Sequence, residues 1–180
     1  MTKSNLQPSE FIREHSVAPP IEPPAQMALT KIIQTPEEWY TLLDLSMLEK
    51  AYSLPTGILK HMIAKESRGH LYAISHRGAK GLFQIMPKEI SGFTGDPFNP
   101  LESAKYAAKT LRNLANHFNT WEQVLAAYNW GRGNVNRKGL EKAPEETRNY
   151  TKFFHSNGMP LGNVMNSMAD IKKFDYNVKG

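Results

Sequence analysis

The feature that most constrains the fold and chemistry of this chain is one charged residue, Glu66, at the end of an expected helix. Four apolar residues recur at helical spacing and define the face that this helix would bury: Ile58, Leu59, Met62 and Ile63. Glu66 follows Met62 by four residues, at the edge of that face, and Gly69 offers a helix stop soon after. Partial desolvation there should raise the pKa of Glu66, which suits it to donate a proton near neutral pH.

The same spacing also fits a less specific interpretation of Glu66. A glutamate near a helix end is commonly a solvated surface group, and Lys60, Lys65 and Arg68 are available as ion-pair partners. The spacing alone therefore leaves both interpretations open.

Composition limits the possible chemistry. The 180 residues suit one domain with an extension, and the absence of cysteine excludes disulfides, thiolate nucleophiles and Cys-based zinc sites. The six histidines form no HExxH pattern, so we expect neither a metal nor another cofactor. The net charge of +5 suits a polyanionic partner, but no Lys/Arg block or zinc-finger motif points to nucleic acid.

The chain divides into a proline-rich extension at 1–34 and a folded domain at 35–180. Four of the six residues in 19–24 are proline, which disfavours a regular helix or a central strand there. The first 16 residues lack the apolar run of a signal peptide, and no later run is long enough for stable membrane insertion. We therefore expect synthesis in the cytoplasm.

The folded part is predicted to be mainly α. Capping residues predict a helix from Thr35 to about Tyr52 and a second helix from Pro55 that carries Glu66. The inward face of the first helix is expected to consist of Trp39, Leu42, Leu43, Ser46 and Met47. Residues 69–87 lose the helical period and predict a loop or a small β-hairpin, which we call the lip.

Further helix starts are expected downstream of the lip. They fall at Pro87, Asn99, Thr120 and Pro144, with a glycine-rich break at 131–134 and a last, weaker helix at about 163–173.

Three motifs carry a resemblance to a known family. Glu66-Ser67, Ser75 and the run GAKGLFQIMP at 78–87 resemble the ES and S-x-x-GA-x-GLMQ-x-MP signature of soluble lytic transglycosylases. Residues 126–135 (AAYNWGRGNV) resemble the family's A-AYNAG-x-G-x-V, and 146–150 (ETRNY) match its ETR-x-Y. The motif-bearing core spans 54–154. The clearest departure is Trp130, where the family usually has alanine.

The resemblance implies an α+β lysozyme-like fold and cleavage of the β-1,4 bond between N-acetylmuramic acid and N-acetylglucosamine in peptidoglycan strands. Glu66 would act as the single catalytic acid and base, and the product would be a 1,6-anhydro sugar. By motif match, the substrate-binding residues would be Ser75, Gln84, Met86, Tyr128, Asn129, Trp130, Glu146 and Tyr150.

One observation on the residues bears on that mechanism. Ordinary glycosidases pair their acid with a second carboxylate roughly 5–10 Å away. No Asp or Glu lies between Glu66 and Glu89, so the lip supplies none, although another part of the fold could.

Two alternatives stay open. The first is a hydrolase similar to goose-type lysozyme, and the second is a non-catalytic wall-binding or phage-particle protein. In either case the expected place of action is periplasmic peptidoglycan, reached in a phage particle, at lysis or through a secretion machine, with 1–34 as a candidate docking segment for such partners.

Overall fold

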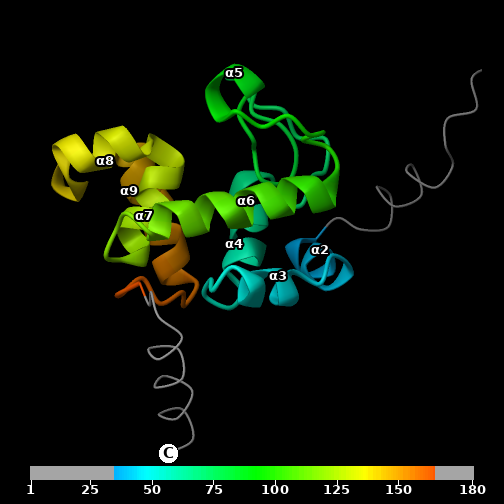
Figure 1. Ribbon diagram of the computed structural model, residues 1–180, viewed down its shortest axis with the longest axis horizontal. Helices are drawn as coiled ribbons and strands as arrows, with labels where there is room; N and C mark the ends of the chain where they lie inside the picture. Colours follow the sequence, from blue (N-terminus) through cyan, green and yellow to red (C-terminus); the bar gives the residue numbers. More distant parts are fainter. Residues whose placement is uncertain (1–34, 165–180) are drawn as a thin grey trace, which may run out of the picture. The chain divides into compact units, whose positions relative to one another are not determined.

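The computed structural model describes residues 35–164, so the expected extension at 1–34 and most of the expected last helix lie outside the described residues. The described part is mainly helical, which confirms the predicted class (Figure 1). Its helices are α2 (Pro36–Leu42), α3 (Leu45–Ala51), α4 (Ile58–Glu66), α5 (Lys88–Ser91), α6 (Pro100–Ala115), α7 (Trp121–Trp130), α8 (Arg132–Lys138), the 3-10 helix η1 (Leu140–Lys142) and α9 (Glu145–Ser156).

Side chains predicted to cap helices do so. Thr35 and Thr120 each form a reciprocal capping box, with Glu38 and Gln123 respectively. The Asn99 side chain accepts from two backbone N–H groups at the start of α6. These bonds satisfy donors that a helix start otherwise leaves unpaired.

The helix expected from Thr35 to Tyr52 is two helices, α2 and α3. The chain bends between them because Asp44 adopts a left-handed backbone conformation with φ 45°, which a short polar residue tolerates. The prediction that Leu42 and Met47 face inward is wrong, since their side chains are 51% and 58% exposed. α4 also begins later than expected, at Ile58 rather than Pro55.

Helix α4 is the centre of the domain and carries Glu66 at its last position. It contacts α2, α3, α6 and α9, and its four predicted apolar residues are fully buried. α6 passes in front of it in Figure 1 and presents mainly alanines to the core. Small side chains allow close approach, so α4 is held by packing along most of its length.

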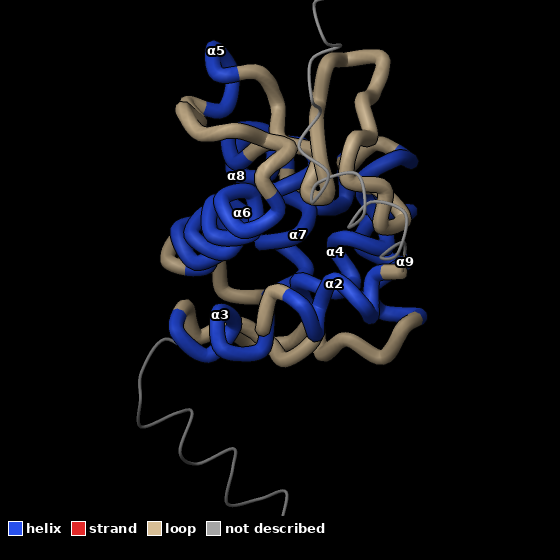
Figure 2. Tube along the Cα trace, turned by 90° about the vertical axis from the view of Figure 1, so that its right-hand side faces the viewer, coloured by secondary structure: helices blue, strands red, loops and turns tan. Residues whose placement is uncertain are grey.

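The lip at 69–87 contains no strand within the described residues, and the hairpin is not confirmed. Figure 2 draws the described residues as helices and loops, with no strand. Isolated antiparallel bridges join Ile74 with Lys80 and Lys80 with Ile85 within the lip. A side chain at Gly81 would collide with the Pro97 carbonyl, so glycine there lets the link to α6 lie against the lip.

Residues 131–134 were expected to be a break, but the break is a single residue. Gly131, with φ 93°, ends α7, and α8 starts at Arg132. The Asn134 side chain donates to the Trp130 carbonyl at 2.7 Å and stabilises this corner. None of the described helices is long and apolar enough to cross a bilayer.

Candidate active site

Glu66 lies where the central helix meets the lip. It is half-buried at the C-terminal residue of α4. The Tyr150 hydroxyl, from α9, donates to Glu66 Oε1 at 2.6 Å. This short bond joins two of the three motifs, which are 84 residues apart in the chain.

The surroundings of Glu66 raise the pKa of its carboxyl to about 7. Burial is the main cause, because an ionised carboxylate loses solvation there, and the negative charge of Glu146 adds to it. The Tyr150 hydrogen bond and the positive charge of Lys65 act in the opposite direction. At neutral pH the carboxyl is therefore populated in both protonation states, which a group that first gives and then takes a proton requires.

A second tyrosine connects the helical part to the lip. The Tyr128 hydroxyl, from α7, donates to the Phe83 carbonyl at 3.2 Å. Burial and the nearby Glu66 charge raise the pKa of both Tyr128 and Tyr150 well above the ordinary value. Both hydroxyls stay protonated at neutral pH and act as donors beside Glu66.

The remaining residues of the second and third motifs occupy different environments. Asn129 accepts a 2.8 Å hydrogen bond from the buried Thr147, which ties α7 to α9. Glu146 is exposed on the first turn of α9, and its negative charge raises the pKa of Glu66.

Lip residues of the first motif make bonds within the lip. The Gln84 side-chain nitrogen donates to the carbonyls of Ala73 and Gly81, at 3.2 and 3.0 Å, and Gln84 has φ 47°. The Ser75 hydroxyl oxygen accepts from Ala79 N at 3.0 Å. Met86 is half-buried. Ser75 and Gln84 therefore shape the lip, and their sugar contacts stay a prediction.

Trp130 is half-buried at the end of α7. It packs against the core, and the Lys138 ammonium lies 5.3 Å from its ring centroid. One face of the ring is thus covered by a cation from α8. Its predicted contact with sugar is not tested by this arrangement.

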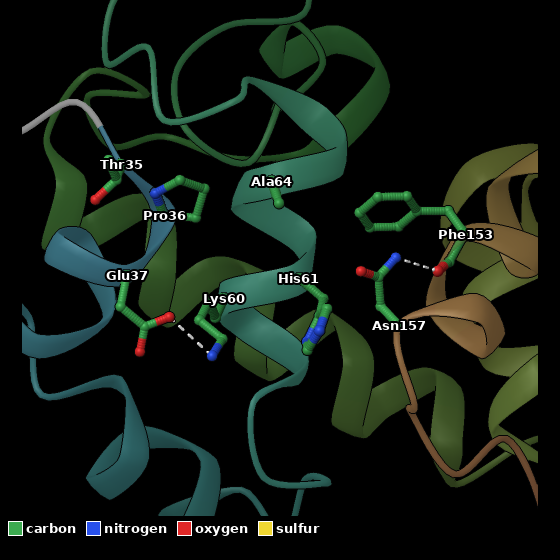
Figure 3. Close-up of a pocket in the computed structure, with 8 residues that line it drawn as sticks. All are labelled: Thr35, Pro36, Glu37, Lys60, His61, Ala64, Phe153 and Asn157. Atoms are coloured by element: carbon green, nitrogen blue, oxygen red, sulfur yellow. Dashed lines mark hydrogen bonds and ion pairs between the residues drawn. The ribbon is translucent and has the colours of Figure 1, made fainter.

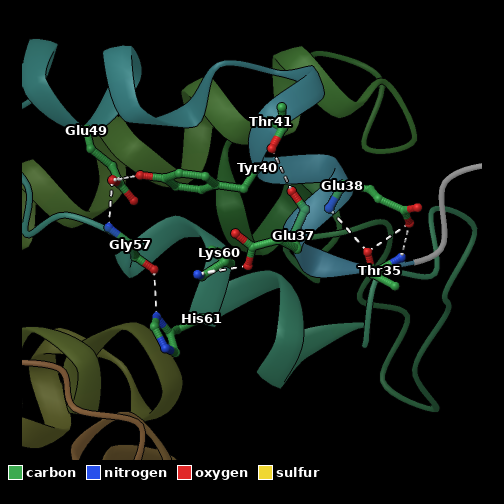
Figure 4. Close-up of polar contacts among 9 residues, drawn as sticks. All are labelled: Thr35, Glu37, Glu38, Tyr40, Thr41, Glu49, Gly57, Lys60 and His61. Carbon is green, nitrogen blue, oxygen red and sulfur yellow. Dashed lines mark hydrogen bonds and ion pairs between the residues drawn. The ribbon is translucent and has the colours of Figure 1, made fainter.

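Helices α2 and α3 together brace α4 at both ends, which was not predicted from the sequence. The Trp39 indole N–H donates at 2.9 Å to the carbonyl of Gly69, three residues after Glu66. At the other end, Tyr40 donates to Glu49 at 2.7 Å, and Glu49 accepts from Gly57 N at 2.7 Å (Figure 4). Glu49 also accepts from Leu59 N at 2.9 Å. We call these residues, Trp39, Tyr40 and Glu49, the α2–α3 brace.

Glu49, the acid of this brace, has 1% of its surface exposed. Burial raises the pKa of its carboxyl, and its three hydrogen bonds lower it. Its position could have been predicted, because it follows Leu45 by four residues on the same helix face. Its partners could not, since they lie on other elements.

A pocket on another side of α4 does not belong to this site. Lys60 and His61 line it with Phe153 of α9 (Figure 3). Lys60 is paired with Glu37 at 2.9 Å, and His61 Nδ1 lies 2.7 Å from the Gly57 carbonyl oxygen. Its polar groups thus already have partners. Within residues 35–164, no three His, Asp or Glu side chains gather as metal ligands.

Comparison with known proteins agrees with this arrangement. The family model described as Transglycosylase SLT domain matches residues 45–151, and the chain belongs to this family. Glu66, the lip and the motifs of α7 and α9 fall inside the match, whereas α2 precedes it.

Solved structures share the fold. An inactive mutant of lytic transglycosylase Slt from Pseudomonas aeruginosa has a TM-score of 0.51 and 21% identity, over 70% of this chain and 25% of that one. A 70-kDa soluble lytic transglycosylase in complex with bulgecin A has a TM-score of 0.51 and 22% identity, over 73% and 27%. The match thus spans about a quarter of these longer proteins.

Proposed function

We propose that this domain is a lytic transglycosylase that cleaves the β-1,4 bond between N-acetylmuramic acid and N-acetylglucosamine in peptidoglycan. The observation that carries the proposal is Glu66: one half-buried carboxyl with a pKa of about 7, bonded to Tyr150 at 2.6 Å. Membership of the family and the fold of the two lytic transglycosylases support it.

The proposed reaction uses Glu66 twice. The protonated carboxyl gives its proton to the glycosidic oxygen as the C1–O bond breaks, so the leaving sugar departs as an alcohol. The resulting carboxylate then takes the proton of the muramyl C6 hydroxyl, whose oxygen bonds to C1. The product is a 1,6-anhydro sugar, water is not consumed, and Glu66 ends protonated.

Neighbouring donors support both halves of this cycle. Tyr150 stabilises the carboxylate form through its hydrogen bond, while burial stabilises the neutral form more strongly, and the resulting pKa of Glu66 is about 7. Tyr128 stays a neutral donor, and its bond to the Phe83 carbonyl holds the lip to α7. Ser75 and Gln84 are the proposed sugar contacts of that lip.

Hydrolysis is the second candidate reaction, and one observation favours keeping it. Glu146 lies close enough for its charge to raise the pKa of Glu66. A second carboxylate of this kind activates water or stabilises positive charge in ordinary glycosidases. In the transglycosylase proposal Glu146 does neither, and its charge only raises the pKa of Glu66.

The products decide between these reactions. Purified sacculi are digested with wild-type protein, Glu66→Gln and Glu146→Gln, and the released muropeptides are analysed by mass spectrometry. The proposal expects 1,6-anhydro ends from wild type, none from Glu66→Gln, and continued anhydro products from Glu146→Gln. Reducing ends that depend on Glu146 would establish hydrolysis instead. If the wild-type protein releases no products, the protein binds the cell wall without cleaving it.

A further inference from the structure

The lip, together with the residue on either side of it, carries a concentrated positive charge. The 22 residues between Glu66 and Glu89 contain four Lys or Arg residues and no Asp or Glu, in a chain whose net charge is +5. Most of the excess base therefore lies in the segment that follows the catalytic helix. The four cations are Arg68, Arg77, Lys80 and Lys88.

The fold does not use these charges. Arg68, Arg77 and Lys88 are exposed and Lys80 is half-buried. Within residues 35–164 none of them pairs with a carboxylate or lies over a ring. Three cations elsewhere have such partners: Lys60 pairs with Glu37, Lys65 lies over Tyr150 and Phe153, and Lys138 lies over Trp130.

The backbone positions of three of the four lie near one another at the end of the lip. Gly78 N donates to the Ser75 carbonyl at 2.9 Å, which makes a tight turn with Arg77 inside it. A Cβ built on Gly78 would lie 3.4 Å from Pro87 Cγ, so the turn packs against the residue before Lys88. Lys80 and Ile85 exchange backbone hydrogen bonds of 3.0 and 2.9 Å. We call Arg77, Lys80 and Lys88 the cationic tip.

The tip adjoins a residue expected to contact the sugar, and apolar side chains flank it. Ser75 closes the same turn, and its hydroxyl oxygen accepts from Ala79 N. Tyr72 and Ile74, earlier in the lip, are 52% and 63% exposed. A ligand at the tip therefore meets positive charge, a hydroxyl and apolar surface within one short segment.

We propose that the cationic tip binds the free carboxylates of the peptides attached to the glycan strand. This inference rests on the proposed function, because it assumes that peptidoglycan is the substrate. The N-acetylated sugars are uncharged, so the fixed anions of the polymer are the peptide carboxylates. Guanidinium and ammonium groups match carboxylates in charge and hydrogen-bond geometry, and Arg77 offers a bidentate contact. The domain would accordingly prefer peptide-bearing to neutral glycan.

Binding is measured in protein carrying Glu66→Gln, so that cleavage does not interfere. Arg77→Gln with Lys88→Gln removes two charges from the tip, and Lys50→Gln with Lys109→Gln removes two exposed charges from α3 and α6 as the matched control. Co-sedimentation at low ionic strength uses native sacculi and sacculi whose carboxylates have been converted to neutral amides. The second polymer keeps its sugars and peptides and loses only the charge.

The tip variant should bind native sacculi roughly three- to tenfold more weakly, as expected for two exposed ion pairs. It should match its parent on amidated sacculi, and the control should change by less than about twofold on either polymer. Equal losses on the two polymers, or equal losses in tip variant and control, would overturn the inference. So would a tip-dependent affinity for phosphatidylglycerol vesicles together with unchanged binding to sacculi, which would assign the tip to lipid headgroups.

The two proposals fail separately. Products are scored by mass spectrometry in protein with intact Glu66. Anhydro products with unchanged binding by the tip variant would reject the carboxylate site alone. A charge-dependent loss of binding without any products would reject the transglycosylase activity and leave the carboxylate site in place.

Discussion

The Tyr150 hydroxyl lies 2.6 Å from Glu66 Oε1, although the two residues are 84 positions apart in the chain. The bond makes the proton affinity of Glu66 a balance of two opposed influences, burial and hydrogen bonding. It also fixes α9 to the end of α4. A single substitution at Tyr150 therefore changes both the pKa of the acid and its orientation.

Tyr150→Phe should move the alkaline limb of the pH–activity profile upward. The bond stabilises the carboxylate, so its removal raises the pKa of Glu66 above about 7. Because the first step needs the protonated acid, activity should persist to higher pH, by about one unit, while kcat at the optimum falls. Tyr52→Phe, at a half-buried tyrosine of the α3 end, is the control. A limb that stays in place or moves to lower pH would contradict the assigned role.

Glu66→Gln should be more stable than wild type at alkaline pH. Folding raises the pKa of Glu66 from 4.5 to about 7. Below pH 4.5 the carboxyl is neutral in both the folded and the unfolded chain and costs no stability. As pH rises through 7, the buried carboxyl must ionise in the folded protein, and the free energy of unfolding falls. Glutamine stays neutral throughout. We expect Glu66→Gln to gain about 1–3 kcal/mol over wild type at pH 8 and nothing at pH 4. Urea unfolding at the two pH values measures this, and a difference independent of pH would contradict the raised pKa.

The sequence was sufficient for features that depend on local spacing. The buried face of α4, the place of Glu66 at its edge and the capping boxes of Thr35 and Thr120 all follow from periodicity and helix-start chemistry. The three motifs also located most of the proposed site. Each of these features involves residues within one or two helical turns.

What the sequence did not predict depends on contacts between distant elements. The bonds of Tyr150 to Glu66 and of Trp39 to Gly69 join residues that no periodicity relates. The bend at Asp44 interrupts what the sequence pattern predicts as one continuous helix. The bend separates α3 from α2, and in α3 the side chains of Leu45 and Glu49 are buried. Tertiary packing outweighed helix propensity there.

Trp39→Phe tests whether the α2–α3 brace positions Glu66. Phenylalanine keeps most of the buried apolar surface but leaves the Gly69 carbonyl without its donor, which should cost about 1–3 kcal/mol of stability. Since Gly69 follows Glu66 by three residues, kcat should fall with little change in KM. Trp121→Phe, a buried tryptophan of α7, is the control for loss of packing. If kcat stays at the wild-type value while stability falls in both variants, the brace is structural only.

Trp130→Ala should weaken substrate binding more than folding. The ring is half-buried, so its truncation should cost less than the roughly 3–5 kcal/mol of a fully buried aromatic residue. Lys138 covers one face, and we expect the other to contact the apolar face of a sugar ring. Lost ground-state binding appears as a higher KM with kcat retained, and we expect a rise of about tenfold. Lys138→Gln uncovers the first face without removing the ring, and it should leave KM nearly unchanged. A large fall in melting temperature with unchanged KM in Trp130→Ala would place the ring in the core and exclude it from the sugar site.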